Sequence, residues 1–271
     1  MKQIKIRPQF KFTDMTSAWD YNWDGGFISV GESHIDLELV YVVSGCVQVT
    51  EDTRLYELTE GDMVIHAPME FHSIKSARNT SPHVYIIALM VKGKIPENLT
   101  EGVFCLSQDE RTEFEALFKR FYSFFHENNT DYLLGQECIN ALSSLFIRMS
   151  LNHKAEPKMM LSHTATEYNK IVMSMQDKVY DNCSLDEIAK LNNISVSNMK
   201  ILFKKYCGLS PKVYYQRLRC TEAIKLMTEG KSSAETADKL NFSSPNYFNT
   251  FFKRITGTPP ASFVRNTYIK K

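Results

Sequence analysis

The sequence predicts a two-domain α+β protein, in which a small N-terminal β-barrel is followed by two helices and then by an all-α domain. Three observations support this prediction. Short β segments separated by turn residues fill the first hundred positions. Two amphipathic stretches follow, and the last hundred positions contain two copies of one helical pattern. We expect the barrel in residues 1–107, the helical pair in 108–153, a linker in 154–165 and the second domain in 166–271.

The composition is that of an ordinary globular protein, with 43% hydrophobic and 23% charged residues among 271. The longest apolar run, residues 84–91, is far shorter than the roughly 18 residues that a membrane helix needs. The basic segment 1–12 lacks the apolar core of a signal peptide. The six cysteines are scattered without CxxC pairs, which gives no support to disulfides or structural zinc. We therefore expect a cytoplasmic protein without a membrane segment.

The first element is the β domain. Its predicted strands are residues 27–30, 37–43, 47–50, 54–58, 62–66 and 83–91. Short strands at this spacing are typical of a small barrel or sandwich. The concave interior of such a domain suits a small molecule.

Two polar motifs occur within these strands and resemble the two cupin motifs. They are Glu32-Ser33-His34 through Glu38 to Ser44-Gly45, and Gly61-Asp62 through Pro68 to His72. In catalytic cupins these positions hold a metal ion, and His34, Glu38 and His72 would supply two histidines and one carboxylate. Glu32 stands where a further histidine is common. Sensor domains built on this frame mostly lack the metal, so we expect neither a metal nor a cofactor.

The better interpretation of these motifs is a cavity for a small-molecule effector. The expected ligand-binding residues are Trp23, Glu32, His34, Glu38 and His72. Trp19, Tyr21 and Trp23 suit stacking on a sugar ring, and they suit a hydrophobic lid on the barrel equally well. The identity of the ligand does not follow from the sequence.

Two helices are predicted next, over residues 108–128 and 132–151. Ser107 and Glu110 form a capping box at the start of the first helix. The first apolar stripe is Phe114, Leu117, Phe118, Phe121 and Phe125, and the second is Leu134, Cys138, Ala141, Leu142, Leu145 and Met149. We expect the first helix to cover the barrel. The second stripe is close to the pattern of a paired helix, so we expect a homodimer there, with monomer packing as the alternative.

The charge is divided unevenly between the two domains. Residues 165–271 contain 17 Lys and Arg against 9 Asp and Glu, a net charge of +8, whereas residues 1–164 carry −7. A basic block attracts nucleic acid because neutralised phosphates release their condensed counterions. A lysine-rich face is equally typical of a surface that contacts only water. The charge alone therefore does not establish nucleic-acid binding, and the sequence motifs provide the further evidence.

The C-terminal repeat consists of two copies about 48 residues apart. Each copy begins with a capping box and a short helix. The boxes are Ser184 with Glu187 and Ser232 with Glu235, and the helices are 185–192 and 233–240. Each helix ends in an Asn-apolar-Ser turn, 193–195 or 241–243, whose asparagine tolerates left-handed geometry.

The second helix of each copy, 196–206 or 245–255, is predicted to carry the contact surface. The apolar stripes are Met199, Leu202, Phe203 and Tyr206, and Phe248, Phe251, Phe252 and Ile255. The opposite faces carry side chains that suit the edges of bases in a major groove. The expected DNA-binding residues there are Ser197, Asn198, Lys200, Ile201 and Lys204, and Pro245, Asn246, Asn249, Thr250 and Lys253.

One long helix, predicted over 211–229, joins the two copies and contributes Arg217 to the expected DNA-binding set. If it separates the two contact helices by about 34 Å, one turn of B-DNA, both enter successive major grooves on one face of the duplex. Both copies end with a glycine that terminates one helix and a proline that begins the next, at residues 208–211 and 257–260.

Residues 166–265 resemble the double helix-turn-helix domain of AraC-type transcriptional regulators. The strongest segment runs from Asn241-Phe242-Ser243-Ser244 through Tyr247-Phe248 to Phe252-Lys253-Arg254 and Gly257-Thr258-Pro259-Pro260. The first copy matches less closely, with Asn192 where an apolar residue is usual. Family members often place an arginine at the positions of Ile201 and Thr250, so only the contact face, and no single base contact, is carried over.

This resemblance implies a ligand-responsive, sequence-specific transcriptional regulator, and activation is the usual role in the family. The implied partners are double-stranded DNA, a small-molecule effector, RNA polymerase and a second copy of the chain. No enzymatic activity is expected. One alternative is a metal-dependent cupin enzyme with a DNA-targeting module. Another is a DNA repair methyltransferase, whose acceptor cysteine needs a basic or metal partner that Cys207 and Cys220 lack in the sequence.

Overall fold

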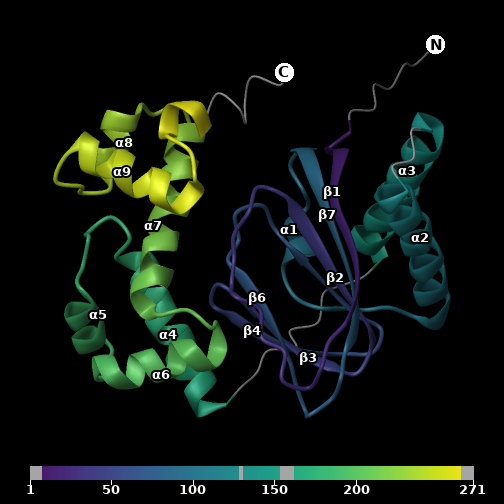
Figure 1. The fold of residues 1–271 in the computed structure, drawn as a ribbon, viewed down its shortest axis with the longest axis horizontal. Helices are drawn as coiled ribbons and strands as arrows, with labels where there is room; N and C mark the ends of the chain where they lie inside the picture. The colour runs from purple at the N-terminus through teal and green to yellow at the C-terminus, as the bar shows by residue number, and fades with distance from the viewer. Residues whose placement is uncertain (1–7, 128–130, 153–161, 264–271) are drawn as a thin grey trace. The chain divides into compact units, whose positions relative to one another are not determined.

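The computed structural model describes residues 8–127, 131–152 and 162–263 of the chain. The chain divides into two compact units, residues 1–160 and 161–271, and each is a separate body (Figure 1). Most of the linker predicted at 154–165 lies outside the described residues. Its last part is helical, because α4 begins at His163.

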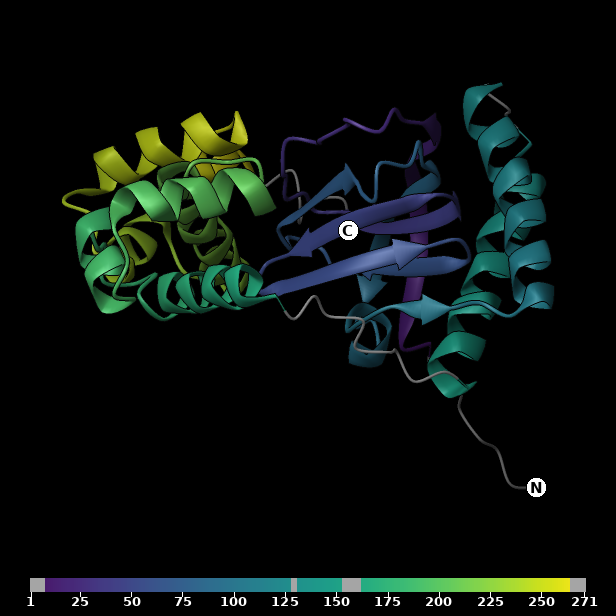
Figure 2. The same cartoon turned by 90° about the horizontal axis from the view of Figure 1, so that it is seen from below.

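Two antiparallel sheets form the N-terminal unit (Figure 2). The larger sheet has the strand order β1 (Phe10–Asn22), β7 (His83–Gly93), β2 (Leu37–Ser44), β5 (Asp62–His66) and β8 (Phe104–Cys105). The smaller sheet has the order β4 (Arg54–Thr59), β3 (Cys46–Glu51) and β6 (His72–Ser76). The predicted cupin-like α+β fold is confirmed, with the difference that the sheets pack as an open sandwich and do not close into a barrel.

The larger sheet has a core on each face. Alternate residues of β2 point to opposite sides, so Leu39 faces one core and Val40 the other. Val40 packs with Val47 and Tyr56 of the smaller sheet. Leu39 belongs to the core formed with the helices α2 (Gln108–His126) and α3 (Tyr132–Asn152). A sheet that is covered on both faces explains why its central strands β7, β2 and β5 are mostly apolar.

The predicted strands differ from those of the structure at several places. Residues 27–30 form only an isolated bridge, between Ile28 and Lys75, and not a strand. Strands β1, β6 and β8 and the short helix α1 (Glu97–Thr100) were not predicted. In β1 the register shifts between Phe12 and Asp14 and again between Met15 and Ser17, and these bulges break the period of two that marks a strand.

Helices α2 and α3 both pack on the larger sheet, and the capping box of Ser107 with Glu110 is present as predicted. The stripe predicted for pairing between two copies lies within the unit's own core. Its residues Cys138, Leu142, Leu145 and Met149 are completely or almost completely buried there. The structure therefore supports the alternative for this stripe, which is packing within the monomer.

Six helices form the described part of the C-terminal unit: α4 (His163–Asp177), α5 (Leu185–Leu191), α6 (Val196–Tyr206), α7 (Pro211–Thr228), α8 (Ser233–Lys239) and α9 (Pro245–Thr256). The capping boxes of α5 and α8 are present as predicted. Asn193 and Asn241 have φ angles of 53° and 52°, the left-handed geometry expected of them. Both helix-turn-helix pairs, α5–α6 and α8–α9, are thus built by the same local rules.

Helix α4 was not predicted, and it packs against α5, α6 and α7. It also explains the unusual residue of the first copy. The Asn192 side-chain oxygen accepts a hydrogen bond of 3.1 Å from Ser174 of α4, and its amide donates to the Ile188 carbonyl at 2.9 Å. A polar residue therefore replaces the usual apolar one without leaving its polar groups unsatisfied.

Candidate nucleic-acid interface and ligand cavity

The predicted contact faces of α6 and α9 are exposed in the C-terminal unit. The stripes that anchor them are buried, with Ile255 only partly so. The exposed residues include all those predicted on these helices, namely Ser197, Asn198, Lys200, Ile201, Lys204, Pro245, Asn246, Asn249, Thr250 and Lys253. The side chains of Ser195 and Ser244 cap the two helices. The same local geometry thus presents one polar face from each copy.

Side chains on the α9 face contribute in different ways. The Thr250 hydroxyl donates to the Asn246 carbonyl at 3.1 Å, so its proton is already used within the helix. Tyr247, next to Asn246, is 55% exposed and was not among the predicted contacts. The sequence contains one indication that Tyr247 belongs to the contact face, because it directly follows Asn246 in the first turn of α9. On the central helix, Arg217 is half-buried and Arg219 is buried.

Arg219 joins the two helix-turn-helix pairs from the middle of α7. Its Nε donates to the Val179 carbonyl at 3.3 Å, and its guanidinium also binds the Asn182 side chain, both before α5. On the other side it donates to the Leu240 carbonyl after α8 and lies 4.1 Å from the centre of the Phe242 ring. One side chain, 5% exposed, therefore fixes both copies to the same helix.

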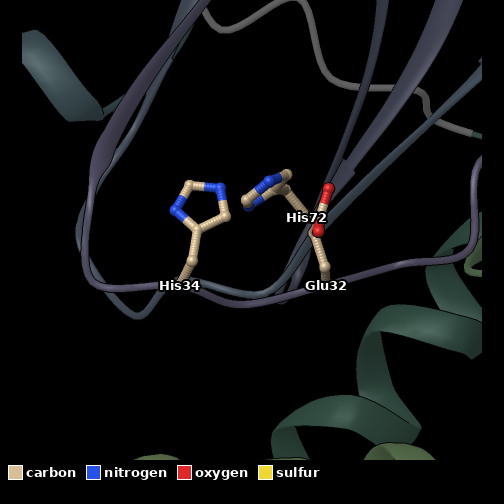
Figure 3. Close-up of side chains that lie close together, drawn as sticks. All are labelled: Glu32, His34 and His72. Carbon is tan, nitrogen blue, oxygen red and sulfur yellow. The ribbon is translucent and has the colours of Figure 1, made fainter. Parts of the chain in front are cut away.

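The N-terminal unit contains a cavity of about 470 Å³, a volume typical of small-molecule sites. Its lining includes all the predicted ligand residues: Trp23, Glu32, His34, Glu38 and His72. Figure 3 shows the imidazole of His72 between the His34 ring and the Glu32 carboxylate. The structure thus brings together side chains from the loop before β2, from β2 and from β6.

Glu38 lies between the two cavity histidines. Its carboxylate oxygens are 3.3 Å from His34 Nε2 and 3.4 Å from His72 Nε2. Burial alone would raise the pKa of Glu38, but the two imidazoles hold it well below its usual range. Contact with Glu38 raises the pKa of His34, and it also raises that of His72 against the opposing effect of burial. Glu38 therefore remains ionised.

A second polar group continues from His72 into the interior and was missed by the sequence analysis. The ring of His66 stacks on His72 with centroids 4.3 Å apart, and its Nδ1 lies 2.7 Å from Glu51 Oε1. Arg54 Nη2 lies 3.4 Å from Glu51 and also pairs with Glu70. Burial raises the pKa of Glu51 to about 8 and lowers that of His66 to about 3. The available signal was a titratable residue, Glu51 or His66, at the end of each of two strands.

Among the described residues, two groups of side chains have donor atoms close enough together to hold a metal ion. They are Glu32, His34 and His72 at the cavity, and Glu51, His66 and Glu70 inside. Imidazole and carboxylate donors fit a divalent transition metal. In the second group Arg54 already supplies a positive charge to both carboxylates. The first group is therefore the better candidate for a metal ion.

Comparison with known proteins supports the assignment of the C-terminal unit. Residues 188–266 match the family model of a helix-turn-helix domain. The chain is similar to the HTH-type transcriptional regulator GbdR of Pseudomonas aeruginosa, with 32% identity over 132 residues, 46% of this chain and 36% of that protein. It is similar to the HTH-type transcriptional activator RhaS of Escherichia coli, with 28% identity over 95 residues, 35% of this chain and 34% of that protein. The chain spans about a third of the length of these curated relatives.

Among solved structures, an apo form of ToxT from Vibrio cholerae aligns with 95% of this chain and 97% of its own, at 13% identity and a TM-score of 0.39. In the part of the chain that the structure describes, no helix combines the length and the apolarity that crossing a membrane requires. The two helix-turn-helix pairs, their connecting helix and the matched family model lead to one assignment. Residues 188–266 form a helix-turn-helix domain that is similar to those of HTH-type transcriptional regulators.

Proposed function

We propose that this protein is a sequence-specific DNA-binding regulator of transcription that responds to a small molecule in its N-terminal cavity. The observation that carries the proposal is the pair of equivalent exposed faces on α6 and α9, which belong to two helix-turn-helix pairs that Arg219 of α7 contacts before α5 and after α8. Such a pair suits two successive major grooves of one duplex. The DNA contacts proposed are the exposed residues of those faces together with Arg217.

The test is to sequence genomic fragments that the full chain retains. We expect a shared motif with two half-sites whose centres are about 10 base pairs apart, one turn of B-DNA. The control variant Lys190→Ala removes a positive charge from the exposed C-terminal end of α5, outside both contact helices, and should select the same motif. Fragments without a shared motif would contradict sequence-specific binding.

The proposed role of the ligand is to change the relative stability of two arrangements of the protein, which requires a different affinity for each. The proposed direction of control is activation, the role in the name of RhaS, with RNA polymerase as the partner. Transcription in vitro from a template with the selected motif should then rise as the protein is added. A fall would make the protein a repressor. Access to the chromosome places such a regulator in the cytoplasm.

A homodimer is proposed through the outward face of α3, because the inward stripe is buried in the monomer. Exposed residues recur there at alternating spacings of four and three: Leu133, Glu137, Asn140, Ser144, Ile147 and Leu151. This is the spacing of a paired helix, with apolar residues at both ends of the face and Glu137, Asn140 and Ser144 between them. Sedimentation of the full chain should show a dimer that Ile147→Lys dissociates and that Lys190→Ala leaves intact.

The alternative of a metal-dependent enzyme has no support among the relatives, which are named as regulators of transcription. The repair methyltransferase is also disfavoured. Burial raises the pKa of Cys207 to about 11 and that of Cys220 to about 12, so neither is an activated thiolate.

A further inference from the structure

The cavity is acidic on one side. Glu32, Asp36 and Glu38 line it, whereas no lysine or arginine of the described residues does. Glu38 is matched by His34 and His72. Glu32 and Asp36 form no ion pair with a lysine or arginine in the described ranges, and the buried Asp36 Oδ1 has no hydrogen-bond partner there.

An aromatic wall forms another side of the cavity. Trp19, Tyr21, Trp23 and Phe27 follow one another as a stack, with ring centroids 5.7, 5.5 and 4.0 Å apart and interplanar angles of 10° to 24°. All four line the cavity. The electron-rich faces of such rings attract cations.

The strand register of the larger sheet sets the distance between the acidic side of the cavity and the aromatic wall. Across β1, β7 and β2, Trp19 is opposite Ile86, which is opposite Val40, and in the next row Ser17, Ala88 and Glu38 are opposite one another. The aromatic strand is therefore two strand spacings, about 10 Å, from the strand that carries Glu38. Ile86 and Ala88 form an apolar floor between them.

We propose that this cavity binds a small organic cation, with an ammonium group at Glu32 and Asp36 and a carbon body over Ile86, Ala88 and the aromatic wall. The inference rests on the proposed role of the cavity as the effector site and names the class of effector. The buried Asp36 Oδ1 supports this position for the ammonium group, because its residue lines the cavity and no group of the described residues donates a hydrogen bond to it. A carboxylate or phosphate ligand would meet the carboxylates of Glu32 and Asp36 here, since no lysine or arginine of the described residues lines the cavity and both histidines already face Glu38.

Tryptophan fluorescence of the full chain tests the proposal, because Trp19 and Trp23 are its two tryptophans and both line the cavity. The probes share a phenyl group and differ at one end: phenethylammonium, phenethyl alcohol and phenylacetate, with benzyltrimethylammonium as a permanent cation. We expect phenethylammonium to bind about tenfold more tightly than the alcohol, as a charge-assisted contact provides, and phenylacetate not to bind. D-glucose and zinc ion, the latter with and without a chelator, complete the set.

The variant Glu32→Gln should weaken phenethylammonium about tenfold and leave the alcohol unchanged, since it removes charge and keeps shape. Glu101→Gln is the matched control, an exposed carboxylate outside the cavity. The backbone pairing of Glu32 with His72 does not involve the altered side chain, so the variant should fold.

The proposal is wrong if phenylacetate or glucose binds as tightly as phenethylammonium, if Glu32→Gln binds it normally, or if neither ammonium probe changes the fluorescence. A response to zinc alone, abolished by the chelator, would assign the cavity to a metal ion. The same preparation is tested on the selected DNA. Retained DNA binding without an ammonium response contradicts only the effector class, whereas an ammonium response without DNA binding contradicts only the regulator.

Discussion

The Ser233 hydroxyl donates a hydrogen bond of 2.7 Å to Asn249 Oδ1, so the first turn of α8 holds a side chain in the middle of the α9 contact face. The corresponding residues of the first copy, Leu185 and Lys200, have no hydroxyl or amide with which to form this bond. With one lone pair of its oxygen bound by Ser233, the Asn249 side chain offers chiefly its two N–H donors to DNA. Guanine presents two acceptors in the major groove, whereas adenine presents one acceptor and one donor.

The first prediction concerns base preference at the position that Asn249 contacts. Binding-site selection with the wild type should favour guanine there, and Ser233→Ala should shift the preference toward adenine, because the freed amide can then offer its oxygen. Asn249→Ala should relax the preference at a cost of about 1 to 3 kcal/mol. Ser243→Ala, an exposed hydroxyl before α9, is the control and should leave the selected motif unchanged. Identical motifs for the wild type and Ser233→Ala would separate Ser233 from base recognition.

Arg219→Met should destabilise the C-terminal unit by about 2 to 4 kcal/mol, because it leaves the buried Leu240 carbonyl and the Val179 carbonyl without their donor. Thermal unfolding followed by circular dichroism measures this loss. Arg217→Met on the same helix is the control and should cost much less, since that side chain is only half-buried. Equal losses in the two variants would show that Arg219 is not a special connection.

Lys253 tests the electrostatic part of DNA binding. It is exposed in the last turn of α9, and Lys253→Ala should weaken binding to all sequences alike. If the lysine neutralises one phosphate, the slope of log affinity against log salt should decrease by about one. Arg217→Ala should behave in the same way. An unchanged slope in a titration from low to high salt would place the altered residue off the DNA.

Local rules made much of the C-terminal unit predictable. The capping boxes at Ser184 and Ser232 and the left-handed Asn193 and Asn241 depend on residues close together in the sequence. Periodicity showed that the α3 stripe is buried, but it cannot tell a neighbouring sheet from a second copy of the helix. Glu51 and His66 lie on two strands that the tertiary fold brings together, and no local sequence pattern predicts such a contact.

This buried pair should make the stability of the N-terminal unit depend on pH. In the folded state burial raises the pKa of Glu51 to about 8 and lowers that of His66 to about 3, against ordinary values of 4.5 and 6.5. The pair therefore holds one proton between these limits, in either location. The unfolded chain holds one proton on these residues between pH 4.5 and 6.5, and none well above 6.5.

From about pH 4.5 to 6.5 the folded and unfolded states hold the same number of protons on this pair, so the pair does not change the free energy of unfolding with pH there. The stability should fall as the pH rises from 6.5 to 8, because only the folded state still binds the proton. One proton corresponds to a slope of at most about 1.4 kcal/mol per pH unit. Urea unfolding followed by tryptophan fluorescence measures it, since Trp19 and Trp23 both lie in this unit. Glu51→Gln should make this fall less steep by the contribution of one proton and leave the part due to His34 and His72, whose pKa values are also raised in the folded state, and Glu101→Gln should retain the whole fall. An equally steep fall in Glu51→Gln would mean that another group holds the proton.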